Sequence, residues 1–115
     1  MEITMARGDL ERRSITLKHS DGTAFTVVPD EIYFSVKLNA KDANVLFQKK
    51  LTTGGIIQTD TNKYQITISP EDTNQMAFGT YDFDIEIVKE GAIKKTFCGV
   101  FTLTKEVTHY YNEGV

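Results

Sequence analysis

Three acidic residues, Asp82, Asp84 and Glu86, are the first candidates for chemistry, because they recur at every second position of "TYDFDIEIV", residues 80–88. In an extended strand this spacing directs all three side chains to one face. Paired carboxylates carry out acid–base catalysis when burial raises the pKa of one of them. Apolar residues occupy the alternate positions here, so we expect the acids on a solvated face. Weak cation binding and catalysis are the alternatives, and the sequence predicts no enzyme.

Other short motifs with known chemical uses lack the partners that such uses need. "RGD" at residues 7–9 suggests adhesion, but three residues recur by chance too often to indicate it, and a turn leading into the strand around Ile15 explains them. "TTGG" at residues 52–55 is followed by neither the lysine nor the helix of a phosphate-binding loop. Cys98 is the single cysteine, which excludes an internal disulfide, and a catalytic thiol would need His19 or His109 beside it. We therefore expect no catalytic, cofactor or metal site.

The composition is typical of one small globular domain. The chain has 115 residues, of which 40% are hydrophobic and 25% charged. A net charge of −3 provides no basic field for nucleic acid. No apolar run approaches the roughly 20 residues needed to span a membrane, and the N-terminus lacks the apolar core of a signal peptide. We expect neither a nucleic acid nor a membrane partner, and the single cysteine is compatible with bacterial cytoplasm.

The prevailing hydrophobic period is two, which predicts strands buried on one face. In one segment, Ile32, Phe34, Val36 and Leu38 share a face. "SPEDTNQM", by contrast, has the serine cap and following proline of a short helix, which we place near residues 70–76. The strand candidates are a stretch around Ile15 and Leu17, a short segment at 24–28, and segments 31–38, 45–51, 56–59, 63–69, 80–88 and 93–104.

The last two strands are expected to form a hairpin. A three-residue loop at residues 89–91 would place Gly91 where a type I turn with a bulge requires positive φ. Lys95 would then lie on the inner face: either its ammonium group reaches solvent at the edge of the sheet, or the bulge shifts the pairing. The register that follows pairs Ile87 with Ile93, Phe83 with Phe97, Tyr81 with Gly99, Glu86 with Lys94 and Ile85 with Lys95.

Many short strands and almost no helix indicate a β-sandwich or barrel. Gly79 and Tyr81 stand where an immunoglobulin-type sandwich carries its tyrosine corner, at the start of the penultimate strand. Antibody-type domains also carry a disulfide between the sheets and a tryptophan in the core. In this chain Phe83 occupies the place of the second cysteine of that disulfide, and there is no tryptophan. The sequence thus predicts an all-β protein, an immunoglobulin-like antiparallel β-sandwich without a disulfide. The domain would span residues 1–108, with a C-terminal tail at 109–115.

Tyrosines supply the candidate interaction residues. Tyr33 is predicted on the outer face of its strand, and Tyr110 and Tyr111 lie in the tail. Exposed aromatic rings can stack on sugars or contact another protein. For Tyr33, the strand propensity of an aromatic residue is an equally good explanation.

Four segments in order resemble a known family: "ITMARGDLERRSITL", "PDEIYFSVKLNAKDANVLFQKKL", "YQITISPEDTNQMAFGTYDFDIEIV" and "GVFTLTKEVTHY". This series is similar to the small immunoglobulin-like domain of phage and prophage tail proteins of Gram-positive bacteria, typified by the N-terminal domain of the baseplate upper protein. The resemblance covers roughly residues 3 to 108.

The resemblance implies a structural role in a phage tail or baseplate, with other tail proteins as partners and a tendency to form homo-oligomers. It carries over no catalytic residues. In the family a fibre or receptor-binding region often follows, whereas this chain stops at Val115, so a stand-alone virion component and a chaperone-like accessory both remain open. The expected location is the virion, or the bacterial cytoplasm before assembly. The alternative function is a carbohydrate- or receptor-binding module.

Overall fold

Eight strands and one helical turn form the protein in a computed structural model, which describes residues 1–105 apart from the side chain of Lys94. The elements in chain order are β1 (Glu2–Ala6), β2 (Glu11–Thr16), β3 (Glu31–Lys37), β4 (Phe47–Lys50), β5 (Ile56–Asp60), β6 (Lys63–Ile68), α1 (Pro70–Thr73), β7 (Gly79–Lys89) and β8 (Ala92–Thr104).

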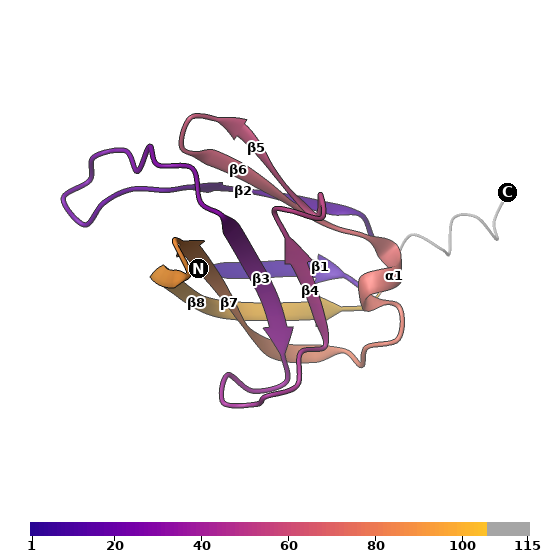
Figure 1. Ribbon diagram of the computed structural model, residues 1–115. Helices are drawn as coiled ribbons and strands as arrows, with labels where there is room; N and C mark the ends of the chain where they lie inside the picture. Colours follow the sequence, from indigo (N-terminus) through magenta and orange to yellow (C-terminus); the bar gives the residue numbers. More distant parts are fainter. Residues whose placement is uncertain (106–115) are drawn as a thin grey trace, which may run out of the picture.

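The strands form two sheets that face each other as a sandwich (Figure 1). The five-stranded sheet has the order β1-β8-β7-β3-β4, and the three-stranded sheet has the order β2-β6-β5. The chain is thus an all-β, immunoglobulin-like sandwich, and its one cysteine leaves it without an internal disulfide.

One strand pair corrects the expectation of a wholly antiparallel fold. β1 runs parallel to β8, with Glu2 opposite Val100 and Ala6 opposite Thr104. β1 and β8 end at the same edge of the sandwich, where Ala6 lies opposite Thr104. From there the turn at residues 7–10 leads the chain into β2 of the three-stranded sheet, so β1 does not form a hairpin with a strand of its own sheet. The backbone N–H of Arg7 fixes this arrangement by donating to the carbonyl oxygen of Thr104 at 3.0 Å.

The core follows the alternation of the sequence. Ile32, Phe34 and Val36 of β3 are fully buried, as predicted, and the rings of Phe34 and Phe83 lie 5.3 Å apart. Leu38 does not share their burial: it is 57% exposed, because β3 ends at Lys37 and the chain turns away. The remaining core residues are Ile3, Met5, Ile15, Leu17, Ile56, Tyr64, Ile66, Ile68, Tyr81, Ile85, Ile87, Phe101 and Leu103.

The segment at 24–28 is not a strand. Only an isolated bridge between Lys18 and Ala24 forms there. Val27 and Val28 remain half exposed in the long loop that connects β2 with β3, visible at the upper left of Figure 1. The β-branched residues favour extended backbone, but this loop supplies no neighbouring strand with which they could pair.

The helical turn forms where its cap predicts it, although α1 covers only residues 70–73 of the expected range. The backbone N–H of Ser69 donates to the Asp72 carboxylate at 2.7 Å, and Pro70 occupies the first turn. Lys49 of β4 adds an ion pair to the same carboxylate at 2.6 Å. This contact fixes α1 against the five-stranded sheet.

The predicted hairpin register is wrong by two residues along most of its length. Val88 pairs with Ile93 and Lys89 with Ala92, so the loop contains only Glu90 and Gly91, which have φ angles of 56° and 73°. A bulge then shifts the ladder. The observed pairs include Ile87 with Lys95, Glu86 with Thr96, Ile85 with Phe97, Phe83 with Gly99 and Tyr81 with Phe101.

Candidate functional site

The two corner residues lie at the start of β7. The Tyr81 ring is buried, and its hydroxyl donates to the carbonyl oxygen of Ala77 at 2.5 Å, the bond that characterises a tyrosine corner. Gly79 has a φ of 140°, which side chains other than glycine rarely tolerate. Together they turn the chain from the connection after α1 into the core strand. Their role is to shape the backbone.

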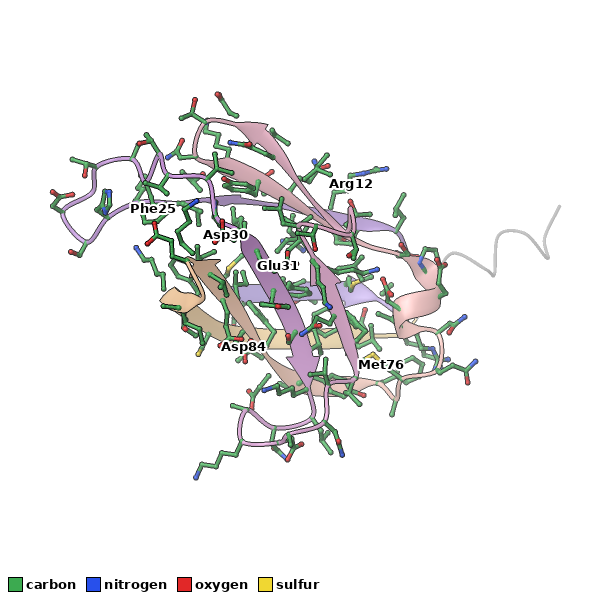
Figure 2. All side chains as sticks on the ribbon, viewed as in Figure 1. Arg12, Phe25, Asp30, Glu31, Met76 and Asp84 are labelled. Carbon is green, nitrogen blue, oxygen red and sulfur yellow. The ribbon has the colours of Figure 1, made fainter. Side chains whose placement is uncertain are left out.

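The row of acids lies on the outer face of the five-stranded sheet and is half buried. Figure 2 labels Asp84, which forms an ion pair with Lys37 of the neighbouring strand at 3.7 Å. The Asp82 carboxylate accepts a hydrogen bond at 2.8 Å from the backbone N–H of Ala40 in the β3–β4 loop. Two of the three acids thus have structural partners, and this arrangement favours a stabilising role over acid–base chemistry.

Tyr33 lies on the same outer face, between Lys50 of β4 and Glu86 of β7. The ammonium group of Lys50 is 5.6 Å from the centre of the Tyr33 ring, a cation–π distance. The ring is half exposed, so one part of it remains open to a partner. Tyr110 and Tyr111, the other two candidate contact residues, lie outside the described residues, as does the predicted domain boundary at residue 108.

The "RGD" motif lies in the turn between β1 and β2 and is bound to the connection after β6. The backbone N–H of Gly8 donates to the buried Thr73 hydroxyl at 2.9 Å. The Arg7 guanidinium lies 4.2 Å from the centre of the Phe78 ring. These contacts give the arginine and the glycine a structural purpose in the fold.

The residues considered for thiol or metal chemistry lie on separate elements. Cys98 is exposed on β8, and the ring of His19, in the β2–β3 loop, packs 5.1 Å from Phe25. His109 lies outside the described residues. Within residues 1–105, no three His, Cys, Asp or Glu side chains are grouped so that they could hold a metal ion. In the same range, no helix is long and apolar enough to cross a membrane.

Two carboxylates at the start of β3, labelled in Figure 2, have lowered pKa values for structural reasons. Asp30 accepts from the backbone N–H of Glu90 at 2.6 Å and from the Lys89 ammonium at 3.2 Å, and these bonds lower its pKa. Burial opposes ionisation of Glu31, but hydrogen bonds from the Thr52 side chain and backbone outweigh it and lower the pKa. Asp30 therefore holds the β7–β8 turn against the sheet, and Glu31 holds the segment that follows β4.

A further feature, which periodicity did not indicate, is the open half of β8. β1 pairs with β8 only from Val100 to Thr104, so among the described residues the stretch 92–99 has a strand neighbour on one side alone. Beside it, between the two sheets, lies a cavity of about 180 Å³. Its walls are Met1, Ser14, Ile15, Thr16, Leu17, Ile85 and Phe97. They come from three distant parts of the chain, which is why sequence reasoning missed them.

Comparison of the chain with models of known protein families, with curated proteins and with solved structures found no match.

Proposed function

We propose that this protein is a non-enzymatic structural component of a phage or prophage tail, a baseplate-type module that joins virion proteins through protein–protein contacts. The observation that carries the proposal is the open half of β8 in an immunoglobulin-like sandwich. The resemblance of four sequence segments to tail proteins supplies the biological setting. The protein would then reside in the virion, and in the bacterial cytoplasm before assembly.

The open strand supports a role in assembly because unpaired backbone N–H and C=O groups are a template for another chain. Natural sandwiches protect such edges or use them for binding. Here the edge borders an apolar cavity, where a partner could bury side chains. The polar groups described above, in contrast, are occupied in holding loops and strands together.

The test is the location of the protein. Particles would be purified after prophage induction or infection and labelled with an antibody against this chain. We expect gold label at the tail, together with co-purification of at least one neighbouring tail protein. Purified particles that lack the protein would overturn the proposal.

A carbohydrate-binding or receptor-binding module is the second candidate, favoured by the half-exposed Tyr33 on a broad sheet face. An aromatic ring on such a face can stack on a sugar. Glycan-array binding that disappears in Tyr33→Ala, or in the double variant at Tyr110 and Tyr111, would support this function. Binding that is unaffected by both changes would exclude these tyrosines as the site.

A further inference from the structure

The open half of β8 presents regularly spaced hydrogen-bonding groups. The backbone N–H of Val100 donates to the carbonyl oxygen of Met1 at 3.2 Å, on the side where β1 lies. Because these groups alternate along a strand, the N–H and C=O groups of Thr96 and Cys98 point to the same side. No strand within residues 1–105 lies there. A further strand could therefore continue the line of β1 along β8.

A strand in this position would also cover the cavity. The cavity opens between β8 and β2, the edge strand of the three-stranded sheet. Its apolar walls include Ile15 and Leu17 from one sheet and Ile85 and Phe97 from the other. Alternate side chains of an added strand point toward the inside of the sandwich, so they would enter this space. Backbone bonding and apolar burial thus favour the same ligand, an extended peptide.

Two extended segments of this chain could bind along the open stretch, β8 of a second copy and residues 106–115, and charge favours the latter. Lys95 lies on the open stretch, where its ammonium group donates to the carbonyl oxygen of Lys18, and Lys94 precedes it. Pairing β8 with β8 of a second copy would bring these lysines near their own counterparts, and like charges on facing strands are unfavourable. Residues 106–115, "EVTHYYNEGV", contain two glutamates and no lysine or arginine, and also valine and tyrosine side chains for the cavity.

Length favours exchange between copies over binding within one copy. The open stretch 92–99 spans about 26 Å, and ten extended residues span about 33 Å, at roughly 3.3 Å per residue. Within one copy, β1 occupies the edge beside residues 100–104. A tail that leaves Lys105 would therefore have to reverse and pass β1 before reaching the open stretch, which would use up much of its length. In a second copy the whole segment is available.

We propose that residues 106–115 of one copy bind as an added strand along residues 92–99 of β8 in another copy, with alternate side chains in the apolar cavity. The contact is head-to-tail, so repeated copies form a ring or a filament. This inference rests on the proposed assembly function and gives it a partner, a second copy of the same chain.

The test uses Cys98, the single cysteine, which is exposed on the open stretch. Cysteine is introduced singly at each position from 107 to 112 of the full chain, and mild oxidation is followed by non-reducing electrophoresis. We expect disulfide-linked oligomers in high yield at the one tail position that lies opposite Cys98, and much lower yields at its immediate neighbours, whose side chains point to the other face. Positions two residues away share the face of Cys98 but lie at the limit of disulfide geometry, so their yields should be intermediate. Light scattering of the unmodified chain should show oligomers.

Two controls separate specific pairing from random collision. Thr59→Cys places a thiol on β5, an exposed site in the other sheet, and should give little cross-linking. Adding Cys98→Ser to each tail variant should abolish the disulfide-linked oligomers on the non-reducing gel, while the oligomers seen by light scattering persist. Circular dichroism checks that every variant folds.

Three results would overturn the proposal. They are a monomer without cross-links, equal yields at all tail positions, and Cys98–Cys98 dimers of the unmodified chain as the main product. The last would show that β8 pairs with β8. None of these bears on whether the protein is present in virions. A cross-linking peak at one tail position, in a protein that is absent from particles, would support the exchange and overturn only the virion function.

Discussion

Replacing Tyr81 with phenylalanine should destabilise the domain, whereas the same change at Tyr64 should not. Both residues are buried, with exposed fractions of 6% and 0%. The Tyr81 hydroxyl donates to the carbonyl oxygen of Ala77, but the Tyr64 hydroxyl has no hydrogen-bond partner among the described residues. Burial also raises the pKa of Tyr64. One oxygen atom is removed in each case, so the two variants are matched controls.

The expected magnitudes follow from the state of each hydroxyl. Loss of the hydrogen bond at Tyr81 should lower the free energy of unfolding by about 0.5–1.5 kcal/mol, the usual net contribution of such a bond. At Tyr64 no bond is lost, and a buried polar group without a partner is removed. That change should leave the free energy of unfolding the same or raise it by up to about 1 kcal/mol. The variants should therefore differ by roughly 0.5–2.5 kcal/mol.

Equilibrium unfolding in guanidinium chloride measures both values. Circular dichroism is the appropriate signal, because the chain has no tryptophan. Equal denaturant slopes would show that the midpoints report stability and not a change in the unfolded state. For a domain of this length, the difference corresponds to several degrees in Tm.

The reasoning fails if Tyr81→Phe is as stable as the unmodified protein, or if Tyr64→Phe is the less stable of the two. The first outcome would mean that the corner bond contributes nothing to the folded state. The second would mean that the Tyr64 hydroxyl is satisfied and stabilising.

Three further changes test other contacts. Gly99→Ala should cost about 1–3 kcal/mol in thermal or chemical unfolding, because the added Cβ would lie 2.4 Å from both the Met1 carbonyl oxygen and the Phe83 ring. Asp72→Ala should cost about 1–2 kcal/mol by losing the cap of α1 and the ion pair with Lys49; unchanged stability would contradict that role. Asp30→Asn should be less stable than the unmodified protein at pH 7, because the pKa of Asp30 is lowered in the folded state. The difference in stability should disappear as the pH falls below about 3.8 and through the lowered pKa, and denaturation curves in the acid range measure it.

The strands that alternate strongly could be predicted from the sequence. In "KYQITI" every second residue is buried, because the strand has one face on the core. In "EIYFSVK" the same alternation holds except at Ser35, which is also buried and accepts a hydrogen bond from the Gln48 side chain. The helical turn was predictable because a serine cap and a proline are local signals. β1 was missed, since its five residues contain only two large apolar side chains, Ile3 and Met5, and its partner strand lies far along the chain.

The hairpin register shows what local rules cannot supply. A two-residue turn with positive φ at both positions normally requires Asn-Gly or a similar pair, so Glu90 gives no signal for it. The Asp30 carboxylate, from the loop before β3, binds the backbone N–H of Glu90 and the ammonium group of Lys89. This long-range contact stabilises a turn that the sequence of the turn alone does not favour.

The candidate site was predictable only in part. The outward row at Asp82, Asp84 and Glu86 follows from period two, but the partners Lys37 and Ala40 depend on which strand and loop lie beside β7. The open stretch of β8 results from the short length of its neighbour, since β1 begins at Glu2, beside Val100, and does not reach residues 92–99. Strand periodicity carries no information on how far a neighbouring strand extends.

The parallel pairing of β1 with β8 also sets when this protein can finish folding. β1 is synthesised long before its partner β8, so the five-stranded sheet cannot be completed until β8 has been synthesised. Closing so long a loop makes folding slow relative to proteins built from local contacts. During that interval Ile3 and Met5, which are buried in the finished sheet, have no partner strand. Folding of this domain is therefore completed only after β8 has been translated.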